Sequence, residues 1–130
     1  MHLIAPNKGP STGTTYDIIV GWGMYMSVPT RRRRIAFLRQ LRTQTRVGCP
    51  ILLSFFPRPI GSRQYHVSVI VSNMIRRMLR QAPAEVGDWL VPFYVHHFTR
   101  DEVASELAEG GFNIDFYSTT EYGHAVGIGV

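Results

Sequence analysis

Cysteine and long apolar runs are the scarcest features of this 130-residue chain. Cys49 is its single cysteine, which excludes an internal disulfide and a multi-cysteine zinc site. No apolar run reaches the roughly 18–20 residues that cross a membrane. The N-terminus lacks a basic segment followed by an apolar core, which a signal peptide would need. We therefore expect a cytoplasmic protein with no membrane partner.

Acidic residues are also few. The chain has 9 Asp and Glu against 14 Lys and Arg, which gives a net charge of +5 at pH 7 and a pI near 9.9. Such an excess of positive charge favours anionic partners in general. With 45% hydrophobic and 18% charged residues, the composition suits one folded domain with a core of its own.

Two continuous apolar runs follow a loop-like N-terminal segment. Residues 1–15 are rich in Gly, Pro, Ser and Thr, and we expect them to be flexible, with the folded part spanning 16–130. The runs at 16–23 and 51–56 predict buried strands, and the spacing of apolar residues at 31–45 predicts a helix between them. This order predicts a right-handed βαβ unit and an α/β fold.

Two further helices are predicted in the second half of the chain. Residues 64–81 carry apolar side chains at helical spacing, with the arginines off that stripe, which indicates an amphipathic helix. The stretch HFTRDEVASELAEGGF predicts another, because Thr99 and Glu102 have the spacing of a capping box and Gly110-Gly111 provides a stop. Short alternating segments on either side of the turn STTEYG then predict an antiparallel hairpin.

The order of these stretches matches one known family. Strand YDIIV, a helix, strand ILLSFF, the capped helix and a terminal hairpin together resemble the C-terminal half of a class I S-adenosylmethionine-dependent methyltransferase. The resemblance implies a partial Rossmann-like sheet of strands 4, 5, 6 and 7, in the family's order 3-2-1-4-5-7-6 with strand 7 antiparallel. These strands would be 16–23, 51–56, 112–118 and 123–130.

The resemblance also implies a site at the carboxyl ends of the strands. Gly21, Trp22 and Gly23 would lie beside S-adenosylmethionine, near its methyl group. The residues expected to line the acceptor side are Tyr25, Met26, Phe56, Tyr94, His97 and Tyr122. Of these, His97 is the catalytic candidate, as a general base. His66 and His124 have no carboxylate or histidine partner at ligand spacing, so we expect no metal site.

Other parts of the family's pattern have no place here. The glycine-rich loop and the acidic residue that binds ribose precede strand 4, and residues 1–15 are too few to hold a strand, a loop and a helix. The resemblance therefore implies a fragment of an enzyme that methylates an unidentified small molecule, inactive by itself. Strand 4 would lack its neighbour, and its apolar edge, Ile18-Ile19-Val20, invites a homodimer.

Two other functions stay open. The run Arg31–Arg34, with the arginines of 64–81, could belong to a basic nucleic-acid-binding module, although no nucleic-acid motif accompanies it and no aromatic residues are interleaved with it. Four cations in a first helical turn oppose the helix dipole by ~0.3–1 kcal/mol each, which an anionic substrate, an acidic neighbour or nucleic acid could offset. The third hypothesis is a non-catalytic domain that binds another protein through its sheet edge.

Overall fold

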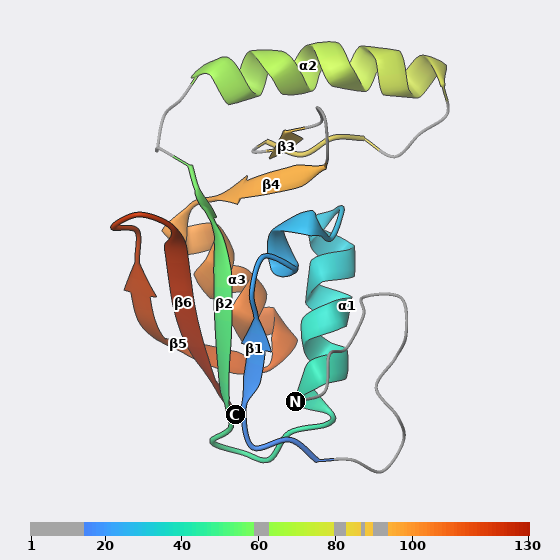
Figure 1. The fold of residues 1–130 in the computed structure, drawn as a ribbon. Helices are drawn as coiled ribbons and strands as arrows, with labels where there is room; N and C mark the ends of the chain where they lie inside the picture. The colour runs from blue at the N-terminus through green and yellow to red at the C-terminus, as the bar shows by residue number, and fades with distance from the viewer. Residues whose placement is uncertain (1–14, 59–62, 80–82, 87, 90–93) are drawn as a thin grey trace.

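The computed structural model of the protein describes residues 15–58, 63–79, 83–86, 88–89 and 94–130 (Figure 1). The expected flexible segment, 1–15, lies outside these residues except for Thr15, and it stays a prediction. In chain order the elements are β1 (Ile19–Gly21), η1 (Tyr25–Ser27), α1 (Arg31–Arg42), β2 (Pro50–Pro57), α2 (Arg63–Met78), β3 (Asp88–Trp89), β4 (Val95–Phe98), α3 (Arg100–Gly110), β5 (Phe112–Ser118) and β6 (Gly123–Gly129).

Six strands of the described residues form one sheet around β2 (Figure 1). β1 runs parallel to β2, β6 runs antiparallel to β2 on its other edge, and β5 runs antiparallel to β6. The order β1-β2-β6-β5 is the order 4-5-7-6 predicted from the sequence, with strand 7 antiparallel. The predicted fold class and the predicted terminal hairpin are therefore confirmed.

β4 is a strand that the sequence did not predict. It runs parallel to the last residues of β2, with Phe56 opposite His97 and Pro57 opposite Phe98, and β3 pairs antiparallel to it. β1 uses the same edge of β2 nearer its beginning, so β1 and β4 lie one after the other along that edge. The consequence is that β4 carries its histidines to the C-terminal end of β2.

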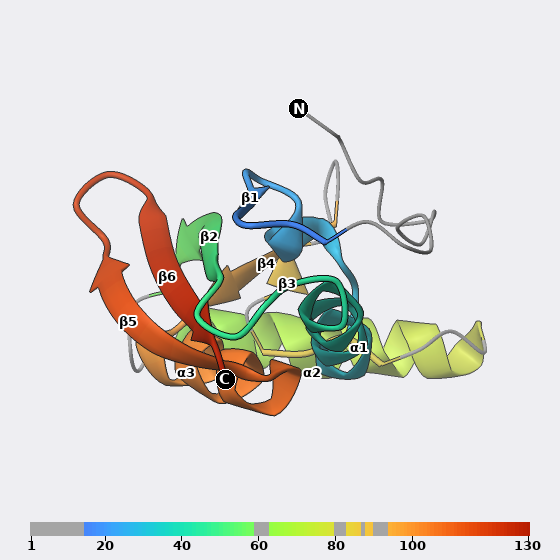
Figure 2. The same ribbon diagram turned by 90° about the horizontal axis from the view of Figure 1, so that it is seen from below.

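Helices α1 and α3 cover one face of the sheet (Figures 1 and 2). α1 begins at Thr30, whose side chain accepts a hydrogen bond from the Arg33 N–H, and α3 begins at the capping box of Thr99 and Glu102. Gly111 ends α3 in the left-handed conformation, with a φ of 93°. The core between this layer and the sheet consists of Tyr25, Leu38, Leu41, Ile51, Leu53, Phe55, Phe98, Val103, Leu107, Phe112 and Ala125.

The helix-facing side of β6 consists of glycine and alanine, because side chains from other elements fill the space in front of it. A Cβ atom on Gly123 would lie 2.2 Å from Cε2 of Phe55. A Cβ atom on Gly127 would lie 3.0 Å from Cδ2 of Leu107. Since successive side chains in a strand point to opposite faces, the larger apolar residues of β6 point away from the helices.

That opposite face of the sheet is open among the described residues. Val20, Leu52, Val126 and Phe116 are in-register neighbours and form a row across β1, β2, β6 and β5. Val20 is 56% exposed and Phe116 is 53% exposed. Continuous apolar strands predicted a sheet covered on both faces. That prediction of buried strands is wrong for this face, where Ile18 is also exposed.

α2 confirms the predicted amphipathic helix, but its apolar stripe points to solvent. The exposed apolar residues of this stretch are Ile70, Val71, Met74, Ile75, Met78 and Leu79. The Asn73 side chain faces the other way and bonds both the N–H and the carbonyl of Ala84. Within the described part of the chain, no helix combines the length and the apolar character that crossing a bilayer requires.

Candidate functional site

The end of β1 forms the edge that the resemblance assigns to the cofactor. Gly23 has a φ of 67°, and its N–H donates a hydrogen bond of 2.7 Å to Oγ of Ser54. Trp22 is exposed, and its ring centroid lies 5.5 Å from that of His124. Since Ser54 pairs with His124 in the sheet, Trp22 reaches across β2 toward β6. Binding of S-adenosylmethionine by Gly21, Trp22 and Gly23 stays a prediction.

Three of the residues predicted for the acceptor side come together at the end of β2. The ring centroid of Phe56 lies 5.5 Å from that of His97 and 5.8 Å from that of Tyr122. They come from three separate elements: β2, β4 and the turn before β6. Open α/β sheets bind ligands at the carboxyl ends of their strands, and this aromatic group stands at that edge.

The other three predicted residues lie on the helix side of the sheet. Tyr25 has no exposed surface, its ring stacks on Phe98 at 4.9 Å, and its hydroxyl donates a hydrogen bond to Glu106. Met26 packs against the core. Tyr94 donates a hydrogen bond of 2.8 Å to Asp88. Acceptor binding by these three stays a prediction, and the structure adds a packing role for each.

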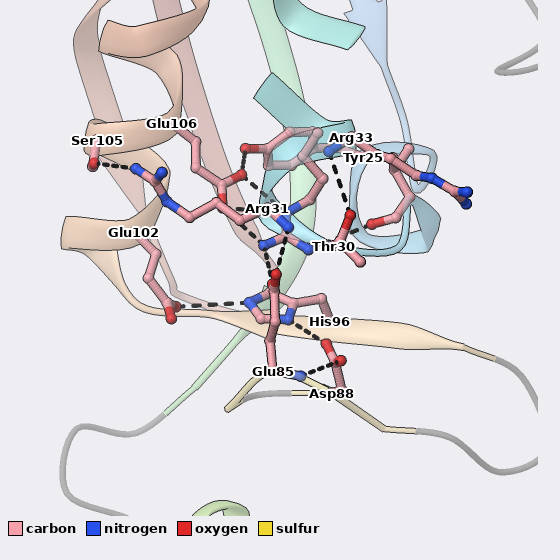
Figure 3. A network of polar contacts seen from close by, with 12 residues as sticks. Tyr25, Thr30, Arg31, Arg33, Glu85, Asp88, His96, Glu102, Ser105 and Glu106 are labelled. Atoms are coloured by element: carbon pink, nitrogen blue, oxygen red, sulfur yellow. Dashed lines mark hydrogen bonds and ion pairs between the residues drawn. The ribbon is translucent and has the colours of Figure 1, made fainter. Parts of the chain in front are cut away.

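A buried ion pair joins the two helices of the covering layer (Figure 3). Arg34 of α1 and Glu106 of α3 are both at most 1% exposed. Nη2 of Arg34 lies 2.8 Å from Glu106 and 2.9 Å from Glu85. Burial lowers the pKa of Arg34, but the bonds and charges of the two glutamates raise it by more, so the net shift is upward. Burial, and then the charge of Glu106, raise the pKa of Tyr25.

The network continues to β4 through a second buried pair. Nδ1 of His96 lies 2.6 Å from Oδ1 of Asp88, and the Glu85 N–H donates to Oδ2 of the same carboxylate at 2.8 Å. Burial raises the pKa of Asp88, but these bonds and that from Tyr94 hold it below its ordinary value. Nε2 of His96 points toward Glu102, whose carboxylate lies 3.9 Å away (Figure 3).

His97, the neighbour of that buried histidine, lies beside the aromatic group. Desolvation, followed by the positive charges of His96 and Arg58, lowers the pKa of His97 below 6.5. The imidazole is therefore mostly neutral near pH 7 and able to accept a proton. Arg58 is in turn held by an ion pair of 2.6 Å to Glu102, the capping-box residue.

Glu85, Asp88 and His96 bring potential metal ligands within 4.8 Å of one another. Their carboxylate oxygens already accept hydrogen bonds from protein donors, including the Arg34 guanidinium and the Arg31 N–H. The guanidinium thus supplies the positive charge that a cation would bring. We assign the cluster a structural role, and the absence of a metal site stays a prediction.

Two of the four arginines in the run Arg31–Arg34 form ion pairs with glutamates of the same chain. Arg34 is buried, and Arg31 pairs with Glu109 and donates a hydrogen bond of 2.9 Å to Ser105. These carboxylates are the acidic neighbours that offset the unfavourable helix dipole. Arg32 and Arg33 are exposed, so the run does not form the four-arginine phosphate-binding patch that the nucleic-acid hypothesis needs.

Sequence reasoning missed the buried network, although one signal pointed to it. Arg34 falls at helical spacing with Leu38 and Leu41, on the core stripe of α1, and Glu106 is adjacent to Leu107 on the stripe of α3. A charged residue on each of two apolar stripes indicates a buried pair. The residues beyond α2 that complete the network carried no comparable signal.

Comparisons with known proteins bear on the fold. No protein-family model matches the chain, and no curated protein matches it. Among solved structures, a SAM-dependent methyltransferase from Methanosarcina mazei has 20% identity and a TM-score of 0.68. Magnesium protoporphyrin IX methyltransferase from Synechocystis PCC 6803, with bound SAH, has 14% identity and a TM-score of 0.54. The pyocyanin biosynthetic protein PhzM has 15% identity and a TM-score of 0.57.

The chain has a methyltransferase fold. The three alignments cover 92%, 91% and 90% of this chain, so the methyltransferase fold extends over nearly all of it. They cover 63%, 47% and 31% of the other chains, so this protein spans from about a third to under two thirds of the structures it matches. The resemblance drawn from the sequence is confirmed at the level of the fold.

The buried ion pair gives a prediction for stability. Replacing Arg34 by Met should lower the free energy of unfolding by about 3–5 kcal/mol, because Glu106 is left buried without its positive partner. Urea denaturation followed by circular dichroism measures the change. Arg33→Met, at an exposed position in the same turn, is the matched control and should stay within about 0.5 kcal/mol of the parent. Equal losses for the two variants would contradict the assignment.

The environment of His97 gives a prediction for pH. Its imidazole should titrate with a midpoint below 6.5 in NMR spectra of the folded chain. Arg58→Gln should raise that midpoint by removing a positive charge, whereas Arg39→Gln should not, because Arg39 on α1 does not contribute to the shift of the His97 pKa. Since folding favours the neutral form, His97 contributes stability above its unfolded pKa and loses it as the pH falls through the folded pKa. A midpoint at or above 6.5 would refute this account.

Proposed function

We propose that this chain is the acceptor-side portion of an S-adenosylmethionine-dependent methyltransferase. The observation that carries the proposal is the placement of Phe56, His97 and Tyr122 at the carboxyl end of β2, the ligand-binding edge of a methyltransferase fold. Trp22 and Gly23 stand at the same edge on the neighbouring strand, where the resemblance puts the methyl group. The acceptor is proposed to be a small molecule.

Methyl transfer depends mainly on the alignment of the acceptor with the methyl group, and it needs no covalent intermediate on the protein. S-adenosylmethionine, when bound, supplies an electrophilic methyl group for in-line displacement. Phe56 and Tyr122 would hold a planar or apolar acceptor by ring contact, which fixes its direction of approach. A nitrogen of the His97 imidazole would take the acceptor's proton where its pKa requires a base, because the low pKa of His97 keeps it neutral.

The fit of the described residues to the cofactor is partial. The end of β1 offers an exposed indole and a glycine with positive φ, which suit close approach to a ligand. The turn after β1 has Gly21 and Gly23 but Met26 where the Gly-x-Gly-x-x-Gly fingerprint needs its third glycine, and the described residues contain no other turn with this pattern. We infer that the cofactor-binding half of the site lies outside this chain and that the chain alone is inactive.

The sheet itself supports this inference. A parallel pair such as β1 and β2 is ordinarily buried on both faces. Among the residues that the structure describes, however, nothing covers the row through Val20 and Leu52, and no strand pairs with the outer edge of β1. A further layer and a further strand would complete the sheet. The solved structures that the chain resembles have additional residues in which such parts can lie, since the chain covers at most 63% of the three described above.

Titration with the cofactor tests the proposal. Calorimetry should show binding of S-adenosylmethionine to the full chain that is weaker than micromolar or absent, because only one wall of the cofactor site is present. The SAM-dependent methyltransferase from Methanosarcina mazei is the positive control. Micromolar affinity would show that the chain holds a complete cofactor site and would defeat the proposal that it is half of one.

The free edge of β1 gives a second prediction. Unpaired apolar edge strands recruit another strand, so we propose that the chain dimerises through β1. Light scattering should give the mass of a dimer, and Val20→Lys should shift the protein to monomer by placing a charge at that edge. Met74→Lys on α2, also an exchange of an exposed apolar residue, should leave the dimer intact. A monodisperse parent monomer counts against the edge as an interface.

A further inference from the structure

The apolar side of helix α2 faces solvent, and its polar side faces the rest of the protein. Its solvent-facing side carries Met74 and Ile75, which are 68% and 54% exposed, whereas Asn73 and Arg76 on the other side are partly buried. A surface helix of a soluble domain ordinarily shows the reverse arrangement. At about 100° per residue, the exposed apolar side chains from Ile70 to Leu79 span about half of the helix circumference.

The charge of α2 has a single sign. The sixteen residues Arg63–Met78 include three arginines and no aspartate or glutamate. Arg77 is exposed and falls about 20° beyond the edge of the apolar stripe, next to Ile70. An apolar face with a basic side chain at its border and no acidic residue is compatible with a helix that lies in the interface of an anionic bilayer.

The position of α2 separates it from the open face of the sheet. Figures 1 and 2 place α2 beyond β4, on the side of the sheet that α1 and α3 cover. A layer that packed on the row through Leu52 and Val126 would lie on the opposite side. The exposed stripe of α2 therefore needs an occupant other than the one that would complete the sheet.

The observations favour lipid over two other occupants. Nucleic acid would use the arginines but would leave the aliphatic stripe in water, because its outer surface is a phosphate backbone. A second copy would cover the stripe but would bring together two helices that carry arginine and no acidic residue, and like charges repel. An anionic lipid surface matches both features, since acyl chains accept the stripe and the headgroups pair with arginine.

We propose that α2 docks the protein on an anionic membrane surface. The helix would lie in the plane of the interface, with the stripe from Ile70 to Leu79 facing the acyl chains and Arg77 among the headgroups. This contact differs from the membrane-spanning helix that hydropathy excludes, and it replaces the sequence-based expectation of no membrane partner. It does not depend on the proposed methyltransferase activity.

Co-sedimentation of the full chain with vesicles tests the proposal. The parent should bind phosphatidylcholine vesicles that contain about 30% phosphatidylserine, and the bound fraction should fall at high salt. Met74→Asp should weaken binding at least tenfold, and Ile70→Asp should do the same. Arg77→Gln should weaken it about fivefold, as expected for one basic residue near an anionic surface. Phe116→Asp, on the sheet face, is the matched control and should bind like the parent.

Several results would overturn the proposal. These are no binding by the parent, equal binding to pure phosphatidylcholine vesicles, or equal losses for Met74→Asp and Phe116→Asp. A change of mass in light scattering on Met74→Asp would assign the stripe to a second copy instead. Salt-sensitive retention on RNA that Met74→Asp leaves unchanged, with no vesicle binding, would assign α2 to nucleic acid. Because Met74 is 68% exposed, the variant should keep the parent's circular dichroism spectrum.

Discussion

The buried contact between Arg34 and Glu106 is the constraint on which the helix layer depends. A buried charge is tolerated only where its partner and remaining hydrogen-bonding groups are all satisfied, so α1 and α3 have one allowed relation to each other. Tyr25 ties the segment after β1 to the same carboxylate, and Glu85 ties the segment before β4 to the same guanidinium. Through these bonds the network reaches β4 and, with it, His97. The position of the residues at the end of β2 thus depends on a network centred on the buried charges of Arg34 and Glu106.

The two faces of the sheet differ: helices cover one face, and the other face is exposed among the described residues. On the helix side, the sheet packs against α1 and α3, whose first turns are capped. On the other side, the residues that the structure describes leave open an apolar row, and they add no strand beyond β1. The proposed function accounts for both features, because in it this chain would supply the acceptor wall and the base, and another part would supply the cofactor wall. The apolar stripe of α2 faces elsewhere, so the molecule presents more than one surface for association.

Local signals in the sequence were reliable, and signals that depend on distant partners were not. The capping box at Thr99, the glycine stop and the terminal hairpin are encoded within a few residues, and each was predicted correctly. β4 was missed because its four residues show no clear period and it forms only against the end of β2. The partner of Arg34 lies 72 residues away, so spacing on α1 could mark the position as unusual without naming Glu106. Hydropathy likewise predicted the stripe of α2 but not the direction in which it points.

The small residues on the helix-facing side of β6 have a consequence for folding. Sliding β6 by one residue against β2 would exchange its two faces. Val126 or Ile128 would then enter the space that Phe55 and Leu107 occupy, where even a single added carbon collides. A hairpin assembled in the wrong register therefore cannot close against α3, and it must separate and pair again. The glycine and alanine residues on one face of β6 therefore favour the correct register during folding, because α3 can pack against the sheet only when this face is turned toward it.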